Sequence, residues 1–302
     1  MLWGQWFYFF TSPRTLPLGP MTSKRFRQSL SSADLAHLQS LLDGAVAPEP
    51  VNAMRFFMGA DPLGWVHSQH VPALKRALPG LASVAGGLCW DVHKRSPAQR
   101  SQDLARAAAA LRDQGLIRGW RDECYSYWGA ISHDPDVVQP EWFRLERAAF
   151  RFFGLRSHAV HINGFTPDGR MWCARRALSK ATDPGRLDNL AAGGLAADET
   201  ILQCAVRELG EEAGLEPSLA QNIQRAGRIT TARTEPEGWH DETLLVFNLC
   251  VPDAVVPHNT DGEVSAFVCL TPSDVMQRIH AAEFSNDAAC VIAQGILNAP
   301  VA

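Results

Sequence analysis

The sequence predicts an α/β protein in which a layered α/β domain follows a smaller α+β domain. Three observations support this prediction. The 302 residues, 46% hydrophobic and 20% charged, suffice for two domains with a core each. The spacing of apolar residues changes at Gly154 from mostly helical to mostly alternating. Beyond that glycine, strand-like runs are separated by helical ones, as in layered α/β folds. We therefore expect domains at residues 25–155 and 156–302.

Helices and short strands are predicted in the first half. Leucines at helical spacing predict a helix over residues 31–42, which Gly44 ends. A capping serine followed by proline at 96–97 predicts the start of a second helix, which runs toward Gly115. A third helix is expected over residues 142–153. The expected strands cover residues 55–58, 64–66 and 123–128.

The second half is predicted to form a sheet with helices packed on it. Residues 158–165 and 170–177 are predicted as strands, and the Thr-Pro-Asp-Gly turn between them indicates a hairpin. A helix is expected over about residues 199–213. Further strands are expected at residues 243–251 and 264–270, and further helices begin near Ser273 and Ser285.

Composition narrows the class of partner and the compartment. A formal net charge of −4 gives no basic footprint, so we expect a small-molecule partner and no nucleic acid. The seven cysteines form no C-x-x-C pair, which indicates thiols in a reducing compartment, and we expect a cytoplasmic protein. No apolar run reaches the roughly 20 residues that span a membrane. Residues 1–24 are expected to be a flexible arm or an overcalled start.

The helix predicted at 199–213 concentrates negative charge. Glu208, Glu211 and Glu212 stand at i, i+3 and i+4, so they share one face. An adjoining apolar stripe would hold this helix against the sheet and keep the carboxylates at a cleft wall. Crowded carboxylates raise their pKa values or bind cations, and oxygen ligands of this kind suit Mg²⁺ or Mn²⁺. The alternative is a solvated acidic face with Arg207 as its counter-ion.

The spacing of this segment decides between these two interpretations. Residues 193–215 match Gly-x5-Glu-x7-Arg-Glu-apolar-x-Glu-Glu-x-Gly-apolar at every fixed position. A chance match is on the order of one in ten million per chain. This pattern is the Nudix box, and the sequence resembles the Nudix hydrolase superfamily. The resemblance implies a mixed sheet between helices and an enzyme that uses Mg²⁺ or Mn²⁺ to cleave diphosphates linked to another moiety.

The resemblance also implies roles for single residues. Glu208, Glu211 and Glu212 would bind metal, helped by the backbone carbonyl of Ala192. Structural support would come from Glu199, Arg207, Gly193 and Gly214. The catalytic carboxylates would be Glu211, Glu212 and a glutamate from outside the box. Our candidate for the last is Glu263, with Glu235, Glu237 and Glu242 as competitors.

A more specific resemblance extends outside the box. Residues 161–165, 172–180, 184–194 and 261–264 look like the Nudix branch linked to fungal thiamine pyrophosphokinase and its plant relatives, in which a smaller domain precedes the Nudix domain. That branch implies hydrolysis of thiamine diphosphate or its damaged analogues. The expected substrate-binding residues are Arg175, Arg176, Lys180, Asn163 and Phe165, with Trp172 and Trp239 as further stacking candidates.

Two other functions remain open at this point. The chain could hydrolyse nucleoside diphosphate derivatives, or it could be a non-catalytic ligand-sensing Nudix module. The complete set of box glutamates and the absence of a helix-turn-helix signal argue against sensing. His67-x-x-His70 and His158-x-x-His161 lack a third soft ligand at suitable spacing and are expected to be structural. The sequence leaves open whether the chain forms a homodimer.

Overall fold

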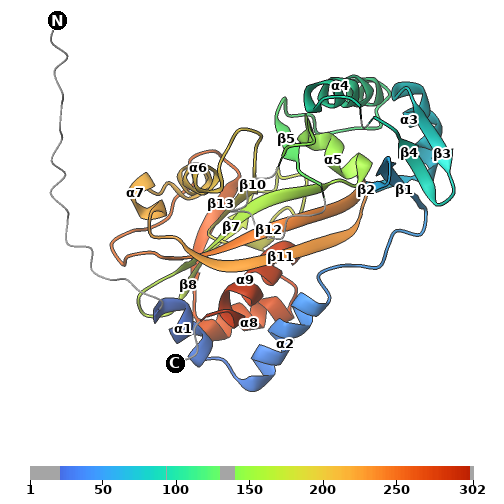
Figure 1. Ribbon diagram of the computed structural model, residues 1–302. Coiled ribbons are helices and arrows are strands. Elements are labelled where there is room, and N and C mark those ends of the chain that lie inside the picture. Colours follow the sequence, from blue (N-terminus) through green and yellow to red (C-terminus); the bar gives the residue numbers. More distant parts are fainter. Residues whose placement is uncertain (1–20, 93, 130–139, 300–302) are drawn as a thin grey trace, which may run out of the picture.

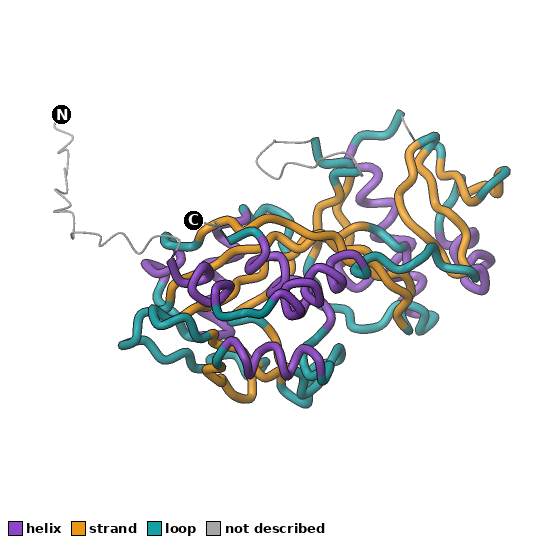
Figure 2. Tube along the Cα trace, turned by 90° about the horizontal axis from the view of Figure 1, so that it is seen from below, coloured by secondary structure: helices purple, strands orange, loops and turns teal. Residues whose placement is uncertain are grey.

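A computed structural model describes residues 21–92, 94–129 and 140–299. A mixed central sheet carries helices on both faces, and a smaller domain lies at one end of that sheet (Figure 1). The view from below shows the same arrangement along the long axis of the molecule (Figure 2). No helix within these ranges is long and apolar enough to cross a membrane.

The smaller domain is an α+β unit, as the sequence predicts. Strands β1 (Ala53–Met58) and β2 (Asp61–His67) form an antiparallel pair. On its other side β1 runs parallel to β4 (Gly87–Trp90), which pairs with β3 (Leu81–Val84). Further elements of this domain are the 3-10 turn η1 (Ser68–His70) and the helices α3 (Val71–Ala77) and α4 (Pro97–Asp113).

Helix α4 begins where the sequence predicts. The hydroxyl of Ser96 accepts a hydrogen bond from the backbone N–H of Gln99, and the Gln99 side chain accepts one from the N–H of Ser96 at 2.9 Å. Pro97 occupies the first turn, where its missing N–H has no helical partner to lose. Leu104 and Leu111 on the inner face are fully buried and hold the helix on the domain core.

The third expected helix is only half helical. Its first part is a strand, β6 (Phe143–Glu146), which pairs with β5 (Cys124–Tyr127). Helix α5 (Arg147–Phe153) follows directly, and the Glu146 side chain accepts a hydrogen bond from the N–H of Ala148 at its start. The expected helix is therefore wrong over residues 142–146, because pairing with a distant strand overrides the local helical spacing.

The central sheet has the strand order β11-β12-β7-β8-β13. Strands β7 and β12 run parallel, and the other neighbours along this path are antiparallel. The predicted hairpin of β7 and β8 is present, whereas β11 was not predicted. The strands are β7 (Arg156–Phe165), β8 (Met171–Arg176), β9 (Leu187–Asp188), β10 (Ala191–Gly194), β11 (Gln224–Glu235), β12 (Gly238–Cys250) and β13 (Val264–Leu270). Of these, β9 pairs with β8 and β10 pairs with β7.

Alternation along β7 sends side chains to both faces of the sheet. Val160 packs in a cluster with Leu209 of the helix on one face, and Ala159 packs with Val291 of a helix on the other face. The central sheet is therefore covered on both sides (Figure 1). The covering helices are α6 (Ile201–Ala213), followed by α7 (Pro217–Ala220), and on the opposite face α8 (Pro272–His280) and α9 (Asn286–Leu297).

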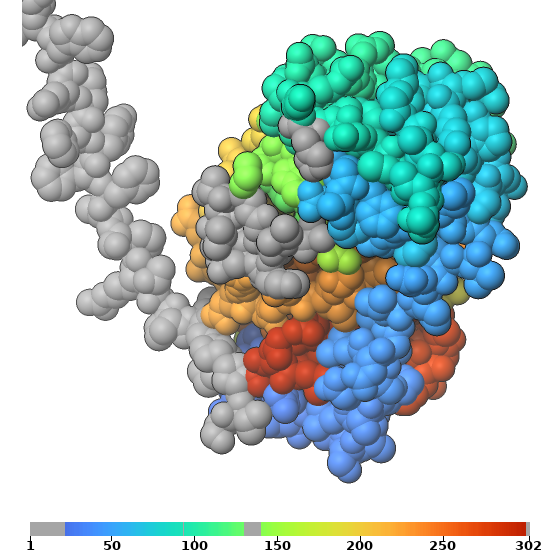
Figure 3. All heavy atoms as spheres, turned by 45° about the vertical axis from the view of Figure 1, so that its right-hand side comes forward, coloured from blue at the N-terminus to red at the C-terminus, as the bar shows by residue number. Residues whose placement is uncertain are grey.

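The first two helices pack on the C-terminal domain, whereas the sequence predicts a helix only at residues 31–42 and places residues 25–155 in one domain. Helix α1 (Met21–Gln28) buries Phe26 and helix α2 (Ser32–Asp43) buries Leu38, both in one cluster with Ile292 of α9. Figure 3 shows these blue helices lying beside the red C-terminal ones. The expected arm lies outside the described residues up to residue 20, and its last four residues begin α1.

Candidate active site

Helix α6 is held firmly at both ends. The hydroxyl of Thr200 accepts a hydrogen bond from the N–H of Gln203 in a capping box, and Gly214 ends the helix with a φ of 62°. Leu209 and Ala213 on its inner face are buried against the sheet. The acidic residues of α6 are therefore presented from a fixed element.

The three glutamates of α6 differ in exposure. Glu208 and Glu212 are 7% and 8% exposed, whereas the side chain of Glu211 is 53% exposed. The i, i+4 pair thus points into the protein, and Glu211 lies at its rim. The predicted acidic face is present, with two of its carboxylates withdrawn from solvent.

Strand β10 passes directly over this buried pair. The N–H of Ala192 donates to a carboxylate oxygen of Glu212 at 2.9 Å. At Gly193 an added Cβ would lie 1.7 Å from Oε1 of Glu208, so only glycine lets the strand approach this closely. The expected metal ligands Glu208, Glu212 and Ala192 are therefore brought together.

Arg207 connects the carboxylates on the outer side of α6. Its guanidinium donates two bonds to Glu199, at 2.8 and 2.9 Å, and further bonds to Glu208 and Glu211. It also reaches the carbonyl of Gly194 at 3.3 Å. A planar guanidinium with several donors can fix the orientation of all these groups at once.

Burial dominates the electrostatics of the pair. It raises the pKa of Glu208 to about 7 and that of Glu212 to about 8. The proximity of the two carboxylates adds to the rise of the Glu212 pKa, because two adjacent negative charges repel. A divalent cation offsets both the cost of burying the two negative charges and their mutual repulsion. An all-oxygen donor set fits Mg²⁺ or Mn²⁺. The residues present therefore fit such an ion.

A pocket of about 400 Å³ lies between the two domains beside this pair. Ala192, Gly193 and Gly194 of β10 form part of its wall. The smaller domain supplies another part, through Arg118, Arg121, Tyr125, Arg147 and Arg151. The pocket therefore brings β10, which covers the buried pair of α6, together with arginines that lie far from it in the sequence.

Tyr125 of β5 lies close to β10 of the other domain at this pocket. A Cβ added to Gly194 would lie 1.7 Å from the Tyr125 hydroxyl. Burial raises the pKa of this hydroxyl, and the guanidinium of Arg147 lies over the ring at 5.4 Å. The phenol therefore stays neutral and can donate a hydrogen bond into the pocket.

Comparison with known families agrees with this geometry. Residues 154–293 match the family described as NUDIX domain, and residues 47–157 match a domain of unknown function, DUF4743. The chain contains a Nudix domain. The predicted superfamily is confirmed for this part of the chain, and the preceding domain is the one described as DUF4743.

Two curated relatives come from Arabidopsis thaliana. Nudix hydrolase 24, chloroplastic, is 32% identical over 65% of this chain and 53% of that protein. Nudix hydrolase 20, chloroplastic, is 32% identical over 67% of this chain and 53% of that protein. The chain spans about half the length of these relatives. The solved structure of DR0079 from Deinococcus radiodurans aligns with a TM-score of 0.43 at 22% identity, over 56% of this chain and 97% of that one.

The three basic residues predicted to bind substrate differ in their position relative to the interdomain pocket. Arg176 and Lys180 line it. Arg176 donates to Asp188 at 2.7 Å, and Lys180 forms an ion pair with Glu263. Arg175 lies outside the pocket lining and donates to the carbonyl of Gly185 at 2.8 Å. Two of the three cations are thus placed where a substrate could reach them.

Asn163 and Phe165 lie in the interior of the Nudix domain, which corrects their expected place at the substrate. The Asn163 side chain donates to the carbonyl of Val291 and accepts a bond from Asn189 at 2.9 Å. Phe165 is fully buried and packs edge-on against Phe26, with ring centroids 5.6 Å apart. Both side chains stabilise the core. The stacking candidates Trp172 and Trp239 likewise pack inside, half-buried and buried respectively.

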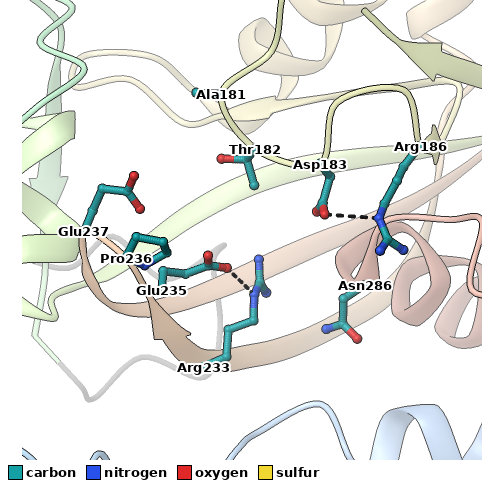
Figure 4. Close-up of a pocket in the computed structure, with 9 residues that line it drawn as sticks. All are labelled: Ala181, Thr182, Asp183, Arg186, Arg233, Glu235, Pro236, Glu237 and Asn286. Atoms are coloured by element: carbon teal, nitrogen blue, oxygen red, sulfur yellow. Dashed lines mark hydrogen bonds and ion pairs between the residues drawn. The ribbon is translucent and has the colours of Figure 1, made fainter. Parts of the chain in front are cut away.

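The glutamates considered for the third carboxylate are spread around the site. Glu263 contacts Lys180, and Glu237 and Glu242 line the interdomain pocket. Glu235 lines a smaller pocket of about 260 Å³ beside it, where it accepts a bond from Arg233 (Figure 4). The arginines of the smaller domain, Tyr125 and His240 escaped prediction, because folding alone brings them into the lining of the interdomain pocket.

Proposed function

We propose that this protein is a hydrolase that uses Mg²⁺ or Mn²⁺ to cleave the diphosphate bond of an organic diphosphate. The observation that carries this proposal is the buried pair Glu208 and Glu212, held under β10, which itself forms part of the wall of the interdomain pocket. Such a pair exchanges its protons for a divalent cation near neutral pH. The names of the Arabidopsis relatives, Nudix hydrolases 24 and 20, support the same chemistry.

The roles of the box residues follow from their contacts. Glu208, Glu211, Glu212 and the carbonyl of Ala192 would hold the ion, which would neutralise the diphosphate and polarise its phosphorus–oxygen bonds. Arg207 keeps Glu208 and Glu211 in place, with Glu199 as its own anchor. Carboxylates that are fixed before the substrate arrives need no reorganisation during the reaction.

A carboxylate must accept the proton of the attacking water. We assign this task to Glu211, Glu212 or Glu263. Burial would raise the pKa of Glu263, but the ion pair with Lys180 outweighs it and holds the pKa below its usual range. Glu263 is therefore ionised, which is the form that a general base requires. Lys180 lines the pocket, so the pair lies at its edge.

The charges around the pocket favour one class of substrate. Arginines of the smaller domain, together with Arg176 and Lys180, suit the oxygens of a diphosphate. The lining also carries Glu242 and Asp287, which suit a positively charged or hydrogen-donating moiety. Thiamine diphosphate and its damaged analogues combine a diphosphate with such a moiety, because their thiazole ring is cationic or polar. They are our first candidates.

The test is a product screen by mass spectrometry in the presence of Mg²⁺. The compounds are thiamine diphosphate, its oxidised analogues, nucleotide sugars, dinucleotides and nucleoside triphosphates. We expect cleavage of thiamine-type diphosphates in preference to nucleotides. If a nucleotide derivative were cleaved in preference, the proposed substrate class would be wrong, but the proposed hydrolysis of a diphosphate bond would stand. If no diphosphate is cleaved, a ligand-sensing role takes its place.

Glu212→Gln is the decisive variant for the metal site. We expect it to lower kcat by about 100-fold or more, since it removes a buried ligand and proton acceptor. Glu216→Gln is the matched control, because the same change is made at an exposed residue just after α6. Equal activity of the two variants would show that Glu212 holds no metal.

The compartment is also part of the proposal. All seven cysteines lie in the described part of the chain and are unpaired, and Cys173, Cys204 and Cys290 are buried. Unpaired thiols persist where glutathione and thioredoxin keep them reduced, so we favour the cytoplasm. The Arabidopsis relatives carry the word chloroplastic in their names.

A further inference from the structure

Three side chains that do not belong to the Nudix box converge in the wall of the interdomain pocket. They are His240 and Glu242 of β12 and Asp287 in the first turn of α9, and all three line the pocket. One ligand atom from each lies within 4.8 Å of the other two. Nε2 of His240 is 3.7 Å from a carboxylate oxygen of Glu242 and 3.7 Å from one of Asp287.

The fold places these side chains on rigid elements. His240 and Glu242 are two residues apart on β12, so both point to the face of the sheet that α9 covers. Asp287 follows the N-cap residue Ser285, whose hydroxyl accepts a hydrogen bond from the N–H of Ala288. Their mutual spacing is therefore set by the packing of α9 on the sheet.

The imidazole of His240 is the unusual member of the group. Its side chain is 5% exposed, and its Nε2 has no hydrogen-bond partner anywhere in the described ranges. A buried polar atom left unpaired has lost its hydrogen bonds to water without replacement, which is unfavourable. The 3.7 Å separations are too long for hydrogen bonds. They do suit a shared cation, since ligand atoms about 2.1 Å from an ion lie roughly 3–4 Å apart.

Both carboxylates are already oriented by neighbours. Arg233 donates to the two oxygens of Asp287 at 2.8 and 3.1 Å, and Ser157 donates to one oxygen of Glu242 at 2.7 Å. Arg233 is also bonded to Glu235 at 2.6 Å, as Figure 4 shows. Carboxylates that bind metals are commonly held in this way by a second set of hydrogen bonds.

The charge balance of the group also favours a cation. Glu235, Glu242 and Asp287 against Arg233 leave a formal charge of −2 (three negative, one positive). A divalent ion neutralises that charge. A ligand set with one imidazole favours Zn²⁺, Co²⁺ or Mn²⁺ over Mg²⁺, which prefers oxygen ligands.

We propose that His240, Glu242 and Asp287 form a second divalent-cation site, selective for transition metals and separate from the Nudix box. The site lies in the pocket wall, so an ion held there has a coordination position facing the pocket for a water molecule or a ligand atom. Glu242 and Asp287 also face the substrate in the proposed function, so the proposal concerns metal binding alone, and its test requires no hydrolase activity.

The test is a Co²⁺ titration of the full chain carrying Glu208→Gln and Glu212→Gln, which removes binding at the box. Visible absorption reports the coordination of Co²⁺, and calorimetry gives its stoichiometry and affinity. We expect one Co²⁺ per chain, with no sulfur-to-cobalt charge-transfer band, and binding of Mg²⁺ at least about tenfold weaker. Absence of Co²⁺ binding in this background would overturn the proposal.

Asp287→Asn and Asp241→Asn provide a matched pair in the same background. Both aspartates accept two bonds from an arginine, Asp241 from Arg156 at 2.7 and 3.1 Å. Asp287→Asn should weaken Co²⁺ binding by more than about tenfold, and Asp241→Asn should not. His240→Gln, which leaves the arginine pairs intact, should behave like Asp287→Asn. If Asp287→Asn and His240→Gln bound Co²⁺ as tightly as Asp241→Asn, the ion would be held by other residues. Thermal melting with and without Co²⁺ checks that each variant is folded.

Discussion

At the scale of the residue, Gly193 and Gly210 show how differently two glycines of the Nudix box act. A methyl group at Gly193 would lie 1.7 Å from the Glu208 carboxylate, whereas at Gly210 it would meet nothing within 4 Å. The atoms in the way at Gly193 belong to the end of a flexible side chain. The fold can therefore accept an alanine there by moving Glu208 out of place.

We expect opposite results from alanine at these two positions. Gly193→Ala should fold but lose the proposed diphosphatase activity by at least about tenfold, because Glu208 leaves the proposed metal site. Gly210→Ala should keep its activity and gain up to about 1 kcal/mol in the free energy of unfolding, since alanine is the better helix former. Steady-state kinetics and urea unfolding measure the two effects. Full activity of Gly193→Ala would contradict the close approach of β10.

His158 on β7 predicts an acid sensitivity of the fold. It lies edge-on to Trp128, and its Nδ1 has no hydrogen-bond partner in the residues described. Burial lowers the pKa of His158 to about 4. Between about pH 6.5 and pH 4 the unfolded chain therefore binds a proton that the folded chain does not. The free energy of unfolding then falls as the pH falls through this window, by up to about 3 kcal/mol in total.

Urea unfolding at pH 7 and pH 4.5 measures this effect. His158→Gln should lose less stability on acidification than the wild-type protein, because the glutamine does not titrate. The difference between the two proteins separates His158 from the buried carboxylates. His258→Gln, at an exposed position, is the control. If His158→Gln lost as much unfolding free energy between pH 7 and pH 4.5 as the wild-type protein, other groups would cause the loss.

At the scale of the element, local signals in the sequence predicted well wherever the structure is decided locally. Helices α2, α4 and α6 start at capping residues that bond to their own first turn. A few adjacent residues are therefore enough to predict where each helix starts. The Nudix box is of the same kind. Its carboxylates, Arg207 and the terminal Gly214 belong to one helix and the strand before it, so spacing alone placed them together.

Prediction failed where an element depends on a distant partner. The segment 143–146 has helical spacing but pairs with β5, and the polar strand β11 is stabilised by β12. The same holds for the site. Arg121 and Tyr125 reach the pocket from the smaller domain, and Asp287 joins His240 only because α9 packs on β12. No short pattern in the chain encodes these contacts.

At the scale of the whole molecule, the core of the Nudix half is not built from one continuous stretch of the chain. The helices α1 and α2 precede the smaller domain, yet they bury Phe26 and Leu38 in the core of the Nudix half. Arg27 of α1 donates to the carbonyls of Leu297 and Ala299 at the other end of the chain. The Nudix half is therefore assembled from both sides of the smaller domain, which packs its own separate cluster.

This arrangement predicts which parts of the chain open together. Leu38→Ala and Leu104→Ala remove the same side chain from two fully buried positions, one in each core. Each should lower the free energy of unfolding by about 2–5 kcal/mol. In hydrogen exchange, Leu38→Ala should speed exchange in α9 and leave α4 protected, because α2 contacts α9 directly. Leu104→Ala should do the reverse. If Leu38→Ala instead loosened α4, the first helices would belong to the smaller domain, and uniform acceleration in both variants would mean one cooperative unit.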